Sequence, residues 1–134
     1  MDQGNTAFLL LAAALVLLMT PGLAFFYGGL VKAKSVISMM MMSFGAIGLI
    51  GVLWVIYGYA IAFPTIEGAA PSPWLFDSSN LFLAAAVDDA AAPAGGYPVL
   101  AFVAFQATFA IITVALISGA IADRAKFGAW MVFA

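Results

Sequence analysis

Aromatic residues at helical spacing are the clearest candidates for chemistry in this sequence. Phe102, Phe105 and Phe109 follow one another at i, i+3 and i+7 in an apolar stretch, so they share one face of a helix. The face of an aromatic ring attracts a cation, by up to about 2 kcal/mol when the cation is partly dehydrated. A ring that lies deeper in a narrow path can close it by steric block and dewetting. Spacing alone, however, indicates packing more often than a cation site.

A polar side chain interrupts the same stretch. Gln106 lies beside Phe105, and an amide inside a membrane is costly unless it faces protein or a water-filled cavity. On a helix that begins at Val99, Phe105 would lie about 9 Å and Phe109 about 15 Å from the start. One ring would then stand near the mouth of a helical bundle and the other one turn deeper. This arrangement suits a small, weakly hydrated cation.

The composition places most of the chain in lipid. The 134 residues are 66% hydrophobic and 7% charged, whereas soluble domains carry about 25% charged residues. No basic patch is present, so we expect no nucleic-acid partner. Cysteine and histidine are both absent, which removes thiolate chemistry and the commonest metal ligand and proton shuttle. We therefore expect no enzyme active site, no metal and no cofactor.

Four apolar segments predict an all-α integral membrane protein. Three complete transmembrane spans are expected at about residues 6–30, 36–63 and 99–121. A fourth segment, residues 127–134, reaches only about 12 Å, against a hydrocarbon core of roughly 30 Å. We therefore expect the sequence to stop inside the start of a fourth span. Residues 65–98 form the predicted loop outside the membrane.

Small and aromatic residues suggest how the second span packs. Gly45, Gly48 and Gly51 recur every three residues and predict a smooth stripe for close helix packing. Three aromatic residues near the end of this span, Trp54, Tyr57 and Tyr59, are predicted to belong to an aromatic belt at the membrane interface. Within the long loop, a seven-residue apolar run, Leu81–Val87, is too short to span. It is predicted to form a short helix at the mouth of the bundle.

The basic residues set the expected orientation. All four lie in the loops that follow the first and third spans: Lys32, Lys34, Arg124 and Lys126. By the positive-inside rule these loops are cytoplasmic, and the N-terminus and residues 65–98 lie outside. The sequence thus predicts a multi-pass protein of the plasma membrane.

Three collinear stretches resemble the ammonium transporter (Amt/Mep/Rh) family. The sequence FFYGGLVKAK at Phe25–Lys34 is similar to the end of that family's first helix, and WVIYGYAIAF at Trp54–Phe63 to the end of its second. Residues Ala104–Phe127 resemble its third helix and the following loop. Together the matches cover nearly the whole chain outside the long loop. The family often has Glu where this sequence has Asp123.

The resemblance implies a fold of about eleven membrane helices in two inverted halves, assembled as a homotrimer with one pore per subunit. It implies recruitment of ammonium by cation–π contact, deprotonation and passage along a hydrophobic pore. Phe105 matches the aromatic residue of the outer recruitment site, and Phe109 matches one of two stacked phenylalanines that gate the pore. Gln106 is expected to support the vestibule. The family's recruiting tryptophan, buried aspartate, paired pore histidines and second gating phenylalanine belong to positions after Ala134.

The sequence therefore predicts the N-terminal portion of an ammonium transporter, which works only within a longer chain and its trimer. A cytoplasmic regulator of the PII type is a possible partner, since it often blocks members of the family. Two alternatives stay open. The chain could belong to the membrane domain of an ammonium sensor, or it could be a short non-transporting membrane protein that binds transporter subunits.

Overall fold

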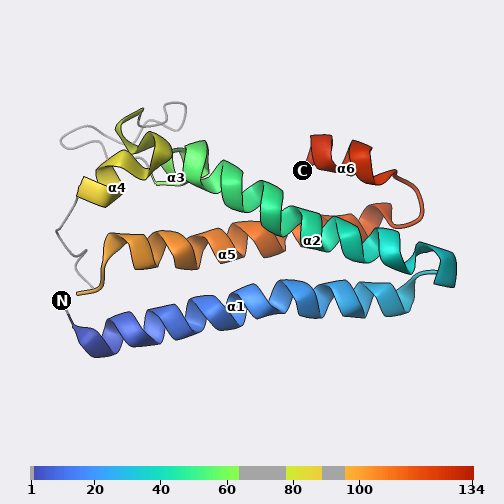
Figure 1. Cartoon of the computed structure of the whole chain (residues 1–134), viewed down its shortest axis with the longest axis horizontal. Coiled ribbons are helices and arrows are strands. Elements are labelled where there is room, and N and C mark those ends of the chain that lie inside the picture. Colours follow the sequence, from blue (N-terminus) through green and yellow to red (C-terminus); the bar gives the residue numbers. More distant parts are fainter. Residues whose placement is uncertain (1, 64–77, 89–95) are drawn as a thin grey trace.

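The computed structural model describes residues 2–63, 78–88 and 96–134, and these residues form helices and connecting turns without any strand. Three helical segments are long and apolar enough to cross a membrane: Gln3–Leu30, Ala33–Ala62 and Val99–Ile121. They lie side by side in Figure 1. The predicted all-α membrane fold with three long spans is therefore confirmed. Most of the predicted loop 65–98 falls outside the described residues.

Each long segment is built from defined helical elements. The first is the single helix α1 (Gln3–Leu30), which continues through Pro21. The second joins a 3₁₀ turn η1 (Ala33–Ser35), the helix α2 (Val36–Leu53), a π-helical turn η2 (Trp54–Gly58) and α3 (Tyr59–Ala62). The third joins α5 (Val99–Ile117) to a 3₁₀ turn η4 (Ser118–Ile121). The remaining elements are η3 (Ser78–Leu83), α4 (Ala84–Asp88) and α6 (Phe127–Phe133).

The three long segments pack against one another, and α6 packs against α2. The turn between α1 and α2 and the turn between α5 and α6 lie at the same end of the bundle (Figure 1). The N-terminus, the start of α5 and the short helix α4 lie at the opposite end. There the Asp2 carboxylate caps α1 by accepting from the Gly4 amide at 2.8 Å. The Asp2 amide in turn donates to the Gly96 carbonyl at 2.7 Å, close to the start of α5.

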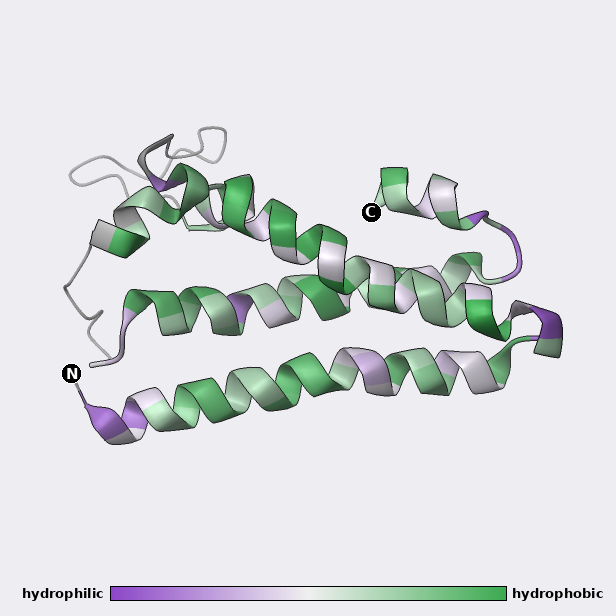
Figure 2. Ribbon diagram, in the orientation of Figure 1, coloured by the Kyte–Doolittle hydropathy of each residue, from purple (hydrophilic) through white to green (hydrophobic). Residues whose placement is uncertain are grey.

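Apolar residues cover almost the whole circumference of each long helix. Figure 2 shows hydrophilic residues mainly at the helix ends and in the turns. Large side chains face outward, for example Phe8, which is 74% exposed, and Ile37, which is 78% exposed. A helix that is apolar all round is buried in protein or lies in lipid. These surfaces therefore face the bilayer or further protein.

Small side chains fill the centre of the bundle. Ala24 of α1, Ala46 of α2 and Ala115 of α5 are completely buried. Small residues let helix backbones approach closely, which favours van der Waals packing where lipid removes the hydrophobic drive for association. Gly119 makes the closest approach, because a Cβ atom built there would lie 2.7 Å from Cζ of Tyr27.

The predicted glycine stripe on α2 is confirmed at Gly45, whereas Gly48 has no close neighbour in the described part of the chain. A Cβ atom at Gly45 would lie 2.9 Å from Sδ of Met131 on α6, so Gly45 is a true packing contact. A Cβ atom at Gly48 would meet no atom of residues 2–63, 78–88 or 96–134 within 4 Å. Residues three apart on a helix are rotated by about 60°, so three such glycines cannot all face one neighbour.

The aromatic-belt prediction is wrong for Tyr59. This residue is only 7% exposed and packs in a core cluster with Leu83, Ala86 and Val103. Leu83 and Ala86 come from η3 and α4, so these elements rest on the bundle. The helix predicted at Leu81–Val87 is confirmed only from Ala84 onward, because Leu81 and Phe82 have non-helical backbone angles. Tyr59 was misassigned because the sequence does not reveal that this helix covers the end of the second segment.

Candidate functional site

The predicted aromatic site lies on the side of α5 that α1 and α2 leave open. Val103 and Ile111 of α5 are buried against the bundle, whereas Phe109 is 40% exposed and Leu116 is 49% exposed. Phe105 is half-buried beside them. The open face of α5 therefore carries a row of large apolar side chains.

Phe105 and Phe109 contact each other directly. Their ring centroids are 5.0 Å apart and their planes meet at 78°, so the edge of one ring points at the face of the other. This edge-to-face arrangement is favoured by the ring quadrupoles and contributes about 0.5–1.5 kcal/mol. It follows from the i, i+4 spacing, which brings side chains together on one helical face. The two predicted site rings thus form one aromatic pair.

Threonine hydroxyls bond to the backbone behind both rings. Thr108 Oγ1 donates to the Phe105 carbonyl at 2.6 Å, and Thr113 Oγ1 donates to the Phe109 carbonyl at 2.7 Å. Hydroxyls in membrane helices commonly find their acceptor on the preceding turn in this way. Neither hydroxyl proton is therefore available to a solute on the open face.

The N-terminal part of α5 is held by the indole of Trp54. Trp54 Nε1 donates to the Val103 carbonyl at 3.2 Å. Trp54 begins the π-helical turn η2, and such turns occur frequently at functional sites. The bond lies two residues before Phe105, so it fixes the turn from which the aromatic pair projects.

A series of ring contacts extends this support. Trp54 packs on Tyr59 with centroids 6.2 Å apart, and Tyr59 packs on Phe63 at 5.3 Å. Phe63 then packs edge-to-face on Phe102 of α5, also at 5.3 Å. Phe102, which the sequence placed on the same face as the site rings, therefore serves mainly to join the second segment to α5.

Phe109 and Gln106 line an open groove between the second segment and α5. The groove has a volume of about 410 Å³, and Trp54 and Phe63 form part of its opposite wall. Phe105 does not line it. The half-buried Gln106 side chain makes no hydrogen bond to any residue within 2–63, 78–88 or 96–134. Its amide is thus available to a solute, to water or to another part of the protein.

A second hollow lies further along α5. It has a volume of about 330 Å³ and is lined by Met19, Gly22, Leu23 and Phe26 of α1 and by Ile112 and Leu116 of α5. Every lining side chain is apolar. Ile112 and Leu116 follow Phe109 by three and seven residues, or about 4.5 Å and 10 Å along the helix. An apolar surface therefore continues from Phe109 toward the end of the bundle that carries the basic loops.

Trp54 is the residue that sequence reasoning missed. The sequence assigned it to the membrane interface, whereas the structure directs its indole to the backbone of α5. The sequence feature that could have indicated this role is Gly58, four residues after Trp54. A Cβ atom at Gly58 would lie 3.1 Å from Cε3 of Trp54. A glycine at this position leaves room for the indole ring.

Comparisons with known proteins cover almost the whole chain. Residues 7–134 match the model of the Ammonium Transporter Family. The ammonium transporter of Mycobacterium tuberculosis (strain H37Rv) is 53% identical over 144 residues, which cover 99% of this chain and 30% of that protein. The ammonium transporter of Aquifex aeolicus is 43% identical over 136 residues, which cover 100% of this chain and 31% of that protein. For the ammonium transporter of Bacillus subtilis the identity is 42% over 137 residues, covering 99% and 32%. The chain thus spans 30–32% of the length of these relatives.

Proposed function

Because the chain belongs to the Ammonium Transporter Family, we propose that it forms the N-terminal part of a transporter, and not an enzyme, that conducts ammonium or ammonia across the bilayer. The observation that carries this proposal is the Phe105–Phe109 ring pair, which stands at the start of a continuous apolar surface on α5. The names of the relatives, ammonium transporters, support the same substrate.

Phe105 recruits the cation in this proposal. Its ring is half-buried near the beginning of α5, so one part of it is accessible while neighbouring protein limits hydration. A cation over such a ring gains about 1 kcal/mol, between the values for exposed and desolvated sites. The amide of Gln106, which has no hydrogen-bond partner among the described residues, lies one residue further on and supports the vestibule by offering a carbonyl oxygen to an ammonium N–H group.

Phe109 acts as the gate. It contacts Phe105, lines the groove and precedes the apolar hollow formed by Leu23, Ile112 and Leu116. A ring at this place blocks hydrated ions by size, and the apolar hollow beyond it disfavours water. A small neutral molecule is hindered less than a hydrated ion, both by the ring and by the apolar hollow.

The apolar hollow favours ammonia over the ammonium ion. Its lining side chains offer no hydrogen bond to a charge, and transfer of an unpaired ion into such surroundings costs several kcal/mol. Ammonium is therefore expected to lose its proton before it enters. The chain contains no histidine, so we assign the proton acceptor to another part of the polypeptide.

The orientation and assembly are part of the same proposal. Both basic loops lie at one end of the bundle (Figure 1), which supports their placement on the cytoplasmic side of the plasma membrane. The ring pair then lies toward the outer side, together with the N-terminus. We further propose a homotrimer and regulation by a cytoplasmic protein of the PII type, as the family resemblance implies.

Flux measurements on the complete polypeptide that carries this chain test the proposal. The protein is reconstituted in liposomes, and ammonium-driven pH changes inside them are recorded for the wild type and for Phe109→Ala. Phe8→Ala is a matched control, because Phe8 is 74% exposed on α1 and lines neither hollow. The proposal requires altered flux in Phe109→Ala and normal flux in Phe8→Ala. Absence of ammonium-dependent flux in the wild type would refute it.

A further inference from the structure

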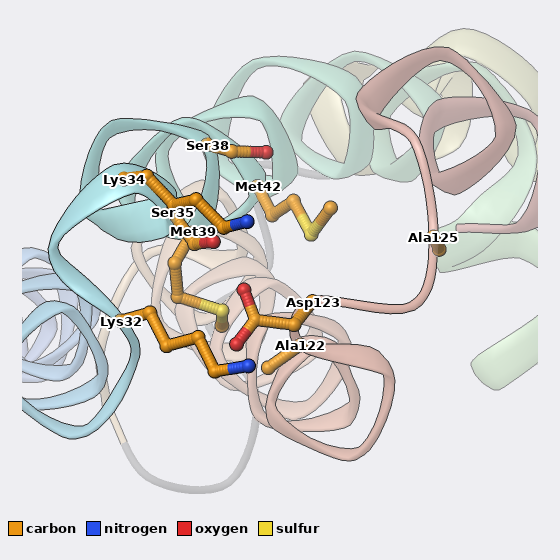
Figure 3. A pocket seen from close by; sticks show the side chains of 9 residues that line it. All are labelled: Lys32, Lys34, Ser35, Ser38, Met39, Met42, Ala122, Asp123 and Ala125. Atoms are coloured by element: carbon orange, nitrogen blue, oxygen red, sulfur yellow. The ribbon is translucent and has the colours of Figure 1, made fainter.

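A polar pocket lies at the end of the bundle that carries the basic loops (Figure 3). It has a volume of about 280 Å³ and is enclosed by the turn between α1 and α2, the start of α2 and the turn between α5 and α6. Its charged lining residues are Lys32, Lys34 and Asp123. Ser35 and Ser38 add two hydroxyl groups. The pocket lies beyond the apolar parts of the helices, at the expected boundary between membrane and water.

The three charged side chains face the same space. Figure 3 shows the ammonium groups of Lys32 and Lys34 and the carboxylate of Asp123 turned toward one another across the pocket. Within the described part of the chain, neither lysine forms an ion pair with Asp123. Asp123 also has a φ of +62°, a left-handed conformation that aspartate adopts more readily than most residues other than glycine. The turn thus holds a carboxylate near two cations and leaves room between them.

This set of groups is complementary to a zwitterion. A simple anion would be attracted by Lys32 and Lys34 but repelled by Asp123. A simple cation would be attracted by Asp123 but repelled by the two lysines. A ligand with one phosphate and one primary ammonium group satisfies all three. The lysine ammonium groups and the serine hydroxyls donate to phosphate oxygens, and the ammonium group donates to the Asp123 carboxylate.

An apolar hollow of about 340 Å³ adjoins the polar pocket. The two share Met39 and Ala122, and the hollow is further lined by residues that include Leu30 and Val31. A polar compartment beside an apolar one, at the boundary of the membrane, matches a lipid with its headgroup and the start of its acyl chains. Basic pockets between helix ends are known to bind lipid headgroups.

We propose that the pocket formed by Lys32, Lys34 and Asp123 binds the phosphoethanolamine headgroup of a membrane lipid. The two lysines hold the phosphodiester, Asp123 selects the primary ammonium group, and the adjoining hollow holds the apolar part of the lipid. The site lies outside the aromatic pair and its groove, so the proposal does not depend on what the protein conducts.

Lipid binding to the complete polypeptide tests this site. Native mass spectrometry is used to compare phosphatidylethanolamine, phosphatidylcholine and phosphatidylglycerol, which share the phosphodiester and differ beyond it. We expect phosphatidylethanolamine to bind about tenfold more tightly than the other two lipids. The reason is that its primary ammonium group forms one additional charge-assisted hydrogen bond with Asp123. Lys32→Gln combined with Lys34→Gln should weaken all three lipids. Lys126→Gln, in the same basic end but outside the pocket lining, is the matched control and should weaken none.

The role of Asp123 gives the decisive comparison. Asp123→Asn should remove the preference for phosphatidylethanolamine, and Asp123→Glu should keep it because the carboxylate is retained. If Asp123→Asn does not fold, a preference lost or absent in folded Asp123→Glu would count against the site. Equal binding of the three lipids, or tighter binding of phosphatidylglycerol, would overturn the proposal. Displacement by soluble phosphoethanolamine as effective as by lysophosphatidylethanolamine would refute the lipid as the source of the headgroup.

Discussion

Replacing Phe105 by leucine separates cation recruitment from packing. Leucine keeps an apolar side chain at the start of the open face of α5 but removes the ring and its quadrupole. The half-buried position of Phe105 suggests a cation–π contribution of about 1 kcal/mol. Since 1.4 kcal/mol corresponds to a factor of ten, this loss should raise the half-saturating ammonium concentration about fivefold. The maximal flux should change much less, because Phe105 does not line the groove beyond it.

The same substitution has a predictable effect on stability. Phe105→Leu also removes the edge-to-face contact with Phe109, whose ring centroid is 5.0 Å away. Such a contact contributes about 0.5–1.5 kcal/mol, so a modest decrease in thermal stability is expected. Phe105→Trp supplies the complementary variant, because indole binds cations most strongly among the aromatic rings. It should lower the half-saturating concentration below that of the leucine variant.

Liposome flux assays over a range of ammonium concentrations measure both quantities for the complete polypeptide. Phe8→Leu, on the exposed face of α1, is the matched control for loss of a ring elsewhere. An unchanged half-saturating concentration in a folded Phe105→Leu variant would refute recruitment by this ring. So would an equal increase in Phe105→Trp and Phe105→Leu, since packing and not the quadrupole would then explain the result.

Three further substitutions test the parts around the ring pair. Trp54→Phe keeps an aromatic ring but loses the 3.2 Å bond to the Val103 carbonyl, which should cost about 1 kcal/mol in a thermal or denaturant unfolding assay. Gln106→Leu removes an amide without a partner in the described residues; melting should stay near that of the wild type, while flux assays show weaker ammonium dependence. Gly119→Val adds a side chain whose Cβ atom would lie 2.7 Å from the Tyr27 ring, and thermal melting should show a loss of about 1–3 kcal/mol from overpacking.

The long helices could be predicted because a membrane span is recognised from the summed hydrophobicity of its residues. Each needs only about twenty apolar residues in sequence, whatever their order, and the three segments at Gln3–Leu30, Ala33–Ala62 and Val99–Ile121 satisfy that condition. Which side of each helix faces inward was much harder to predict. A helix that is apolar all round has no polar face to mark its outside. Tyr59 was misassigned for this reason, since neither composition nor spacing shows which neighbour a residue meets.

In the candidate site, too, local contacts could be predicted and contacts between distant residues could not. Contact between Phe105 and Phe109 follows from local helical geometry, so the sequence was sufficient to predict it. The bond from Trp54 to Val103 joins residues 49 positions apart and depends on the π-helical turn at the end of α2. That turn shifts the direction of the following side chains, and no periodic pattern predicts it. Likewise, the sequence does not show that the Asp123 carboxylate faces two lysines, because Lys32 and Lys34 lie in a distant turn that only the fold brings close (Figure 3).

The open shape of the apolar surface bears on how this chain could take part in conduction. The groove at Phe109 and the hollow at Leu23 are bounded by α1, the second segment and α5, and their other side is open. In a bilayer, acyl chains would fill an apolar trough of this kind, because lipid and leucine are equally apolar. A conducting path therefore needs a second wall that excludes lipid. The relatives offer the means, since 68–70% of their length lies outside the region matched by this chain. The ring pair and the apolar surface thus supply one wall of the proposed pore, and the gate at Phe109 becomes effective only when the opposing wall faces it.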